Sequence, residues 1–347
     1  MNTSLEGHIR IDLDCVGQPR VAVCRPLDMQ QLLWHKTRDE VRARMGALYG
    51  ICRHSHNLAS ELAYARLDED QPPHHLPLLR LRALLENIQE GLWHLCMVLP
   101  QALGRTPPVG HMAKIRRVIA TIVECPELDL ARMSIQDHME TLLSAETLLT
   151  HSRMLEDDML LAESRIAGLP LPALPSLDET LILQHLEWLD GQINEHPDFV
   201  SLPALPAGCA ENTPDRTDNR APLTSRVRQL TERIRASLEA LKTDTPESAL
   251  PCGARRIGDR ALSWTETSRG WLIHSLALKD GRTRRYRIVA PTEWNFHPQG
   301  PVAHHLKAAA QSSGMPDEHS ARLIALAWNP CVPLQVSTSE PGVRSHA

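Results

Sequence analysis

Near its C-terminal end the chain reads Ala327-Trp328-Asn329-Pro330-Cys331-Val332-Pro333-Leu334. A second stretch near the start reads Tyr49-Gly50-Ile51-Cys52-Arg53-His54-Ser55-His56-Asn57-Leu58-Ala59-Ser60. Each stretch carries a single cysteine, and almost the whole chain separates them. The two thiols can share one site only if the fold brings both ends of the chain together.

Composition excludes several classes of protein. The chain has 347 residues and a net charge of −5, and its Lys and Arg residues are scattered, which argues against a nucleic-acid partner. It has no apolar run of the roughly 18 residues that a membrane span needs, and its N-terminus lacks a signal pattern. We therefore expect a soluble cytoplasmic protein with no membrane partner.

The spacing of the cysteines excludes several kinds of metal and redox site. The eight cysteines are spread singly, and no two form a Cys-x-x-Cys pair, which excludes a zinc ribbon or a thioredoxin motif. In the cytosol these residues are reduced thiols, and a small buried side chain is the usual role of each. Cys52, His54 and His56 form a C-x-H-x-H pattern, but on a helix they point to different faces, so a zinc site there is disfavoured.

Hydrophobic periodicity predicts a mostly helical fold with a small antiparallel sheet, an α+β class. We expect a hairpin over residues 6–27 and helices over 28–66, with Asp28 as a cap and a break near Gly46–Gly50. Further helices are predicted over 76–99, 111–124, 132–165 (two helices), 177–193, 224–242, 302–313 and 317–327. Three strands are predicted over 261–265, 271–278 and 283–289, and Asp280-Gly281 indicates a hairpin turn.

These segments predict one domain, with a small sheet built from both ends of the chain. Its parts are the N-terminal hairpin and motif helix (5–66), a helical core (76–200) and a flexible Pro-rich loop (about 202–221). A helix (224–242) and a β-meander with the C-terminal motif (255–336) follow. We expect four arginines of the 224–242 helix to form a solvated face: Arg226, Arg228, Arg233 and Arg235.

Several blocks, in the correct order, resemble the large subunits of [NiFe]-hydrogenases. Gly50, Cys52, His56 and Ala59 match the family pattern R-x-C-G-x-C-x-x-x-H-A-x-A-S, whereas Tyr49 replaces its first cysteine. The terminal D-P-C-x-x-C pattern becomes Asn329-Pro330-Cys331-Val332-Pro333-Leu334, so Leu334 replaces its second cysteine. The other matching blocks are Leu5–Ile11, Ser268–His274, Asp280–Tyr286 and Pro291–Asn295. We found no such match for about residues 105–255, and the expected fold is a truncated large-subunit-like fold.

The resemblance implies a metal site with half of its ligands. In the family each motif supplies two cysteines to a nickel–iron centre, and the chain keeps only Cys52 and Cys331. With Tyr49 and Leu334 at the other two positions, no nickel is expected. Low-spin iron that carries cyanide and carbon monoxide needs from the protein only soft thiolates and a suitable pocket. Cys52 and Cys331 are therefore the predicted metal ligands, and no catalytic residue is predicted.

The resemblance also implies groups that contact the cyanides. The family places an Arg and a Ser or Thr at these positions, and Arg269 and Thr292 match them here. Either His56 supports the cysteine site through a hydrogen bond or it simply packs beside it. Glu6 matches a family position associated with proton traffic, although a structural role is favoured for it.

Among such proteins, the chain resembles most the hydrogenase expression/formation proteins of the HupK/HoxV kind, which are large-subunit-like accessory proteins. This resemblance implies a non-catalytic maturation factor that carries or scaffolds the Fe(CN)2CO intermediate of the [NiFe] cofactor. It implies maturation chaperones, cofactor-assembly proteins and the apo large subunit as partners. One alternative is a metal-free scaffold that recruits the chaperones by mimicking the large subunit. An enzyme with a remodelled iron site is the least favoured hypothesis.

Overall fold

Two small β-sheets, with helices around them, bring the two cysteine stretches to the same side of the molecule. The computed structural model describes residues 7–13, 19–25, 29–67, 75–150, 152–166, 174–213 and 222–338. Asp28, Glu6, Cys15 and the turn of the predicted N-terminal hairpin lie outside these residues. No helix in the described ranges is long and apolar enough to cross a membrane.

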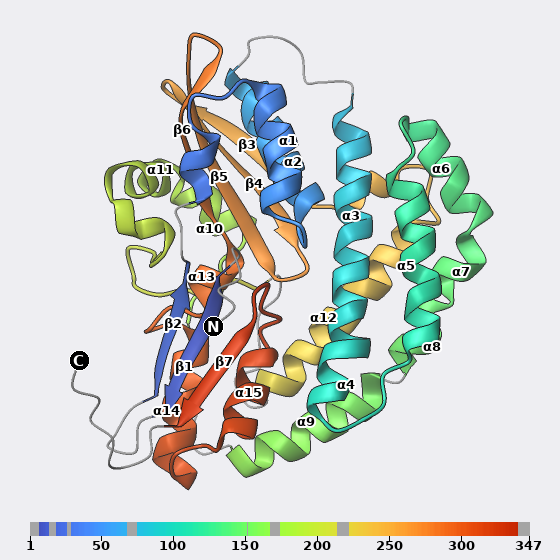
Figure 1. The fold of residues 1–347 in the computed structure, drawn as a ribbon, viewed down its shortest axis with the longest axis vertical. Coiled ribbons are helices and arrows are strands. Elements are labelled where there is room, and N and C mark those ends of the chain that lie inside the picture. Colours follow the sequence, from blue (N-terminus) through green and yellow to red (C-terminus); the bar gives the residue numbers. More distant parts are fainter. Residues whose placement is uncertain are drawn as a thin grey trace.

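The first sheet joins the two ends of the chain. It consists of β1 (His8–Leu13), β2 (Arg20–Cys24) and β7 (Leu334–Thr338), in the order β2-β1-β7. β1 runs antiparallel to β2, as predicted, but parallel to β7, which was not predicted as a strand. Ile9 pairs with Leu334, and its N–H donates to the carbonyl of Pro333 at 2.9 Å. The C-terminal cysteine stretch is thus tethered to the N-terminal strand (Figure 1).

The second sheet is an antiparallel meander, so the single sheet expected from the sequence is in fact two. Its strands are β3 (Cys252–Ile257), β4 (Arg260–Thr267), β5 (Gly270–Lys279) and β6 (Arg282–Val289). The prediction missed β3. Asp280 and Gly281 both have positive φ, 53° and 71°, as the predicted hairpin turn between β5 and β6 requires.

Helices cover both faces of this meander, which explains why β5 is buried almost throughout. α1 (Arg38–Leu48) and α2 (Arg53–Leu67) cover one face, where Tyr64 packs against Leu272. α10 (Glu179–Gln184) and α11 (Leu186–Glu195) cover the other, where Leu189 packs in a cluster with Ile273. Adjacent strand residues point to opposite faces, so Leu272 and Ile273 enter different clusters.

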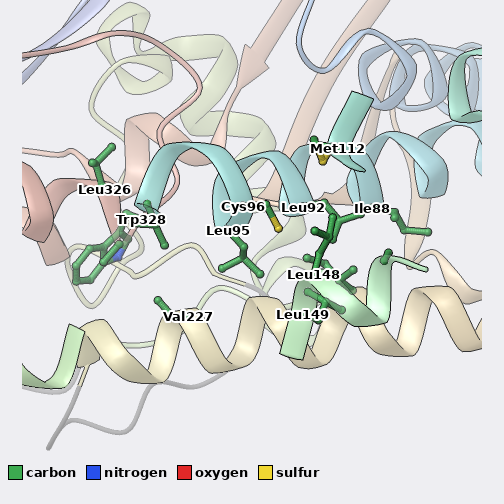
Figure 2. Packing of buried hydrophobic residues seen from close by; sticks show 14 of the residues in the cluster. Ile88, Leu92, Leu95, Cys96, Met112, Leu148, Leu149, Val227, Leu326 and Trp328 are labelled. Carbon is green, nitrogen blue, oxygen red and sulfur yellow. The ribbon is translucent and has the colours of Figure 1, made fainter. Parts of the chain in front are cut away.

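A bundle of helices forms the largest core. It contains α3 (Leu76–Trp93), a π-helical turn (His94–Val98), α4 (Leu99–Ala102), α5 (Val109–Val123), α9 (Ser152–Ile166) and α12 (Pro222–Ala240). Figure 2 shows Leu92, Leu95 and Leu148 filling the space above α12, with Leu326 and Trp328 at one end. This core supports α3, which carries two of the carboxylates at the site described below.

The remaining helices correct two predictions. The segment predicted as two helices over 132–165 is interrupted at both His138 and Ser144, within the described residues, without any Pro or Gly to mark the bends. The helix predicted over 177–193 is likewise divided, into α10 and α11. The other elements are α6 (Leu128–Asp137), α7 (Met139–Leu143), α8 (Ala145–Thr150), α13 (Pro291–Asn295), α14 (Pro301–Ser313) and α15 (Glu318–Leu326).

The solvated arginine face predicted on α12 is wrong for Arg226. This side chain is buried, forms an ion pair with Glu211 and stacks on Trp328, with its guanidinium carbon 4.1 Å from the ring centre. Arg228, in contrast, is exposed and pairs with Glu156. A buried guanidinium needs a carboxylate or an aromatic face to replace water, and here Arg226 has both.

Candidate functional site

Cys52 lies in the turn between α1 and α2, directly before the first residue of α2. Its carbonyl accepts the N–H of His56 at 3.0 Å, so the first helical turn fixes the position of the cysteine backbone. The carboxylate of Glu86, on α3, accepts the N–H groups of His54 (2.8 Å) and Ser55 (3.0 Å). These N–H groups have no partner within the helix, so Glu86 serves as an external cap and holds the cysteine turn against α3.

Cys331 lies in the short connection between α15 and β7. Asn329 precedes it with a φ of 44°, a conformation that asparagine tolerates better than most residues. The Asn329 side-chain amide donates to the carbonyl of Ser268 at 3.4 Å. The hydroxyl of Thr292, in α13, lies 3.1 Å from the Cys331 sulfur. Thr292 therefore lies at the cysteine, as the sequence predicts for a residue of this site.

Arg269 lies in the turn between β4 and β5 and reaches the other cysteine. Its Nη1 is 3.4 Å from the Cys52 sulfur, and its Nη2 donates to Glu90 on α3 at 3.1 Å. Burial alone would lower the pKa of Arg269, but Cys52 and Cys331 in their thiolate form, together with the Glu90 carboxylate, raise it above its ordinary value. Arg269 is thus a fully charged group that lies close to both thiols.

A pair of asparagines aligns the turn that carries Arg269 with the helix that carries Thr292. The side chain of Asn212 accepts the Trp271 N–H at 2.6 Å and donates to the Trp271 carbonyl at 2.8 Å, as a neighbouring strand would. Its backbone N–H and carbonyl bond to the side chain of Asn295, in α13. Asn212 belongs to the segment predicted as a flexible loop. Its residues 210–213 are instead buried, while the flexibility of the rest stays a prediction.

We expect Gly270→Ala to destabilise the protein by about 3 kcal/mol or more, because it would break this asparagine clamp. Gly270 has a φ of 133°, and a Cβ there would lie 2.4 Å from the carbonyl oxygen of Asn212. Urea unfolding would measure the loss. Gly46→Ala is the matched control, since Gly46 lies in α1 and a Cβ added to it would have no other atom within 4 Å. It should stabilise the protein by about 0.5–1 kcal/mol. An unchanged midpoint for Gly270→Ala would contradict the clamp.

Both thiols open into one cavity of about 270 Å³. Tyr49 and His56 also line it, together with apolar residues such as Ile51, Val200 and Val332. The cavity joins the turn before α2, the connection before β7 and the end of β6. The structure thus brings together Cys52, Cys331, Tyr49 and His56, four of the residues that the sequence singles out.

Leu334, the other predicted position of a lost ligand, is not among the residues that line the cavity. It lies in β7, pairs with Ile9 and packs against the main core. Its pairing with β1 therefore places this position against the core and not on the cavity wall.

Arg25 and Glu293 are site residues that the sequence analysis missed. Arg25 follows β2 and donates to Glu293 from Nε (3.1 Å) and Nη2 (2.7 Å), and both residues line the cavity. Burial alone would lower the pKa of Arg25, but Glu293 and Cys331 raise it. Each thiol therefore has a guanidinium nearby. Glu293 directly follows Thr292 in the matching block, a signal that could have identified it.

The Cys52 thiol is held neutral by its surroundings. Burial raises its pKa well above the ordinary range, and the nearby carboxylates of Glu86 and Glu90 add to this effect, while Arg269 opposes it. A ligand that takes a thiolate must therefore supply positive charge to replace the proton. This arrangement suits a site in which Cys52 stays a neutral thiol until a metal cation binds.

His56 belongs to a chain of buried polar side chains. Its ring stacks on Tyr49, with the ring centres 3.9 Å apart. Its Nδ1 lies 3.0 Å from Nε2 of His274, whose Nδ1 lies 2.8 Å from the hydroxyl of Tyr286. No hydrogen bond links the ring of His56 to either cysteine, so packing beside Tyr49 is the role that these contacts support. Among the described residues, no group of three or more His, Cys, Asp or Glu side chains lies close enough together to hold a metal ion.

The His56–His274 pair predicts loss of stability in acid. Burial lowers the pKa of His56 to about 3 and that of His274 well below its ordinary value of 6.5. Between about pH 6.5 and 3 the unfolded chain therefore binds more protons than the folded one. The contribution of this pair to the free energy of unfolding should be constant above pH 6.5 and fall below it, by up to ~1.4 kcal/mol per pH unit for each histidine.

Urea unfolding between pH 7.5 and 5 measures this slope. His56→Phe retains an aromatic ring on Tyr49 and should reduce the slope, because one buried titratable group is removed. His196→Gln changes an exposed histidine at the end of α11 and should leave the slope unchanged. Equal slopes for the wild type and His56→Phe would show that this pair does not titrate as described.

Comparison with curated proteins identifies relatives along nearly the whole chain. HupK of Azotobacter vinelandii, a hydrogenase expression/formation protein, is 26% identical over 324 residues, which cover 90% of this chain and 92% of HupK. The predicted resemblance to hydrogenase expression/formation proteins is confirmed. HoxV of Cupriavidus necator is 40% identical over 116 residues, and there the match spans only 29% of the length of HoxV. No protein-family profile matches the chain.

Solved structures confirm the predicted large-subunit fold. The [NiFeSe]-hydrogenase of Dm. baculatum superposes with a TM-score of 0.61 over 90% of this chain and 93% of that chain, at 12% identity. The enzyme of D. vulgaris Hildenborough gives a TM-score of 0.60 at 11% identity, with the same coverage. The chain is thus similar in sequence to hydrogenase expression/formation proteins and has the fold of [NiFe]-hydrogenase large subunits.

Proposed function

We propose that this protein is a non-catalytic maturation factor that holds the Fe(CN)2CO unit while the [NiFe] cofactor is assembled. The observation that carries the proposal is the convergence of Cys52 and Cys331 in one cavity, with a hydrogen-bond donor at each sulfur. In this proposal the iron unit is cargo, which arrives from one maturation protein and leaves to another.

The donor set fits such a cargo. Thiolates are soft ligands that suit low-spin iron. The guanidinium of Arg269 and the hydroxyl of Thr292 are donors, and donors are what anionic diatomic ligands need from their surroundings. Both donors lie in buried positions, where hydrogen bonds to charge are stronger than in water.

Each side chain at the site would have its own role when the iron unit binds. Cys52 and Cys331 lose their protons and bind iron, and Arg269 and Arg25 compensate the charge of the two sulfurs. Tyr49 and Leu334 offer no further thiolate, so a four-thiolate nickel site cannot form. The iron unit can be released easily, because only two protein ligands, the two cysteines, have to be exchanged.

Metal analysis of the purified protein tests the proposal. Protein isolated without oxygen from cells that make the whole maturation machinery should contain stoichiometric iron and no nickel. The double variant Cys52→Ala/Cys331→Ala should contain neither metal. Equal iron contents in the two proteins would refute the proposal.

One observation favours a second function, a metal-free scaffold that mimics the large subunit to recruit maturation chaperones. Burial raises the pKa of Cys52 well above its ordinary range, which favours a packed neutral thiol over a thiolate ligand. A scaffold would retain its partners after loss of both thiols. Co-purification of maturation proteins with the double variant, together with normal hydrogenase activity in the cells, would establish this function instead.

A further inference from the structure

Tyr49 is held in a fixed position on the wall of the cysteine cavity. It directly follows α1, and its N–H donates to the carbonyl of Met45 at 3.0 Å. Its ring stacks on His56, with the ring centres 3.9 Å apart, and packs against the apolar cluster that contains Met45. The tyrosine ring therefore occupies a defined part of the wall, three residues before Cys52.

The position of Tyr49 is one from which a third metal ligand could reach the cavity. Two ligands three residues apart on a turn commonly bind the same metal ion, as in the Cys-x-x-Cys pairs of zinc sites. Residue 49 has this spacing from Cys52, and both residues line the cavity into which Cys331 also opens. Ligands from positions 49, 52 and 331, with one water molecule, would complete a tetrahedral zinc site.

The other possible zinc ligands at the cavity are engaged in contacts of their own. Of the described residues that line it, four have side chains of the types that bind zinc: Cys52, Cys331, His56 and Glu293. Nδ1 of His56 lies 3.0 Å from a ring nitrogen of a second histidine, and Oε1 of Glu293 accepts two hydrogen bonds from Arg25. The two thiols therefore remain as the ligands that the cavity offers to a metal.

We propose that Tyr49 determines which metal the site takes, because it leaves a bare zinc ion without a third ligand. Zinc binds to proteins through three or four side chains, and here it would find two. The Fe(CN)2CO unit carries three ligands of its own, so two thiolates are enough to hold it. The inference rests on the proposed function, since it explains how a pair of cysteines accepts that cargo and rejects free divalent ions.

Leu334 cannot control the number of ligands in this way. It pairs with Ile9 in the first sheet and is not among the residues that line the cavity. A thiol at position 334 would therefore not join the two cysteines. The two positions at which the chain lacks a cysteine of the large-subunit motifs thus differ, and Leu334 provides a matched control for Tyr49.

The zinc affinity of the metal-free protein, measured by competition with a chromogenic chelator, tests the proposal. The wild type should bind zinc weakly, and Tyr49→Cys should bind it about a hundredfold more tightly, because a third thiolate joins the set. Addition of Cys52→Ala to Tyr49→Cys should remove this gain, which places the zinc at the cysteine site. Leu334→Cys should have the zinc affinity of the wild type.

Tyr49→His provides a second test if Tyr49→Cys does not fold. It retains an aromatic ring on His56 and adds a nitrogen ligand, so zinc affinity should rise about tenfold. A folded variant of either design with the zinc affinity of the wild type would overturn the proposal. So would a gain in Leu334→Cys equal to that in Tyr49→Cys.

The zinc titration needs no iron, so its outcome is separate from that of the proposed function. Iron in the wild type isolated from cells tests whether the protein carries the cargo. If that iron is absent while the zinc affinities follow the predicted order, the proposed function fails and the selectivity of the cavity against zinc stands. If iron is present but Tyr49→Cys gains no zinc, the cargo is held and Tyr49 does not determine the choice of metal.

Discussion

Replacing Cys52 with alanine should abolish iron binding and reduce hydrogenase maturation to the level of cells that lack this protein. Cys52 is one of only two thiols that line the cavity in the described chain, and alanine offers no lone pair to a metal. The variant should lose iron binding and maturation activity but should still fold. Arg269 retains Glu90 as its partner, so we expect the free energy of unfolding to change by no more than about 1 kcal/mol.

Hydrogenase activity in cells and the iron content of the purified variant measure this effect, and Cys125→Ala is the control. Cys125 is a partly buried thiol after α5 that bonds to the carbonyl of Thr121 and does not line the cavity. Its variant should behave as the wild type. Full maturation activity with Cys52→Ala would show that this thiol is dispensable and would favour the metal-free scaffold.

Replacing Arg269 with methionine should cost both stability and iron. The side chain is buried and is paired with Glu90, and removal of one partner of a buried pair costs about 3–5 kcal/mol, because the remaining charge is left uncompensated. Iron should be lost as well, since Arg269 is the donor that contacts Cys52 and compensates both sulfurs. Arg269→Lys should not rescue binding, because one ammonium cannot replace the fork that spans the sulfur and the carboxylate.

The double variant Arg269→Met/Glu90→Gln separates the two losses. It removes the unpaired carboxylate and should recover most of the stability in urea unfolding, whereas bound iron should remain absent. A double variant that is stable and carries the wild-type amount of iron would show that Arg269 serves the fold alone.

The parts of the fold that repeat a simple pattern could be predicted from the sequence. The strand around Ile9, the turn at Asp280-Gly281 and the amphipathic helix α12 follow from period-two alternation, from turn chemistry and from helical spacing. Likewise the blocks that match the large subunits placed Arg269 and Thr292 near the cysteines, and the structure has both within 3.4 Å of a sulfur.

The rest depends on contacts that no local pattern encodes. β7 is a strand only because β1, more than 300 residues earlier, offers it a parallel edge. Asn212 lies in a polar, proline-rich segment, yet it is buried because its side chain replaces a strand partner for Trp271. Arg226 is buried because Glu211 and Trp328 meet it from other parts of the chain. The strand β7 and the burial of Asn212 and Arg226 all depend on polar contacts between residues far apart in the sequence, which hydrophobic periodicity cannot predict.

The central claim, that the two cysteines hold an iron unit with cyanide and carbon monoxide, can be tested most directly by infrared spectroscopy. The sample is the protein purified without oxygen from cells that make the whole maturation machinery. Metal-bound cyanide and carbon monoxide absorb where protein groups hardly do. We predict bands in this window that disappear in Cys52→Ala. A blank spectrum from wild-type protein that still co-purifies with maturation partners would contradict the claim.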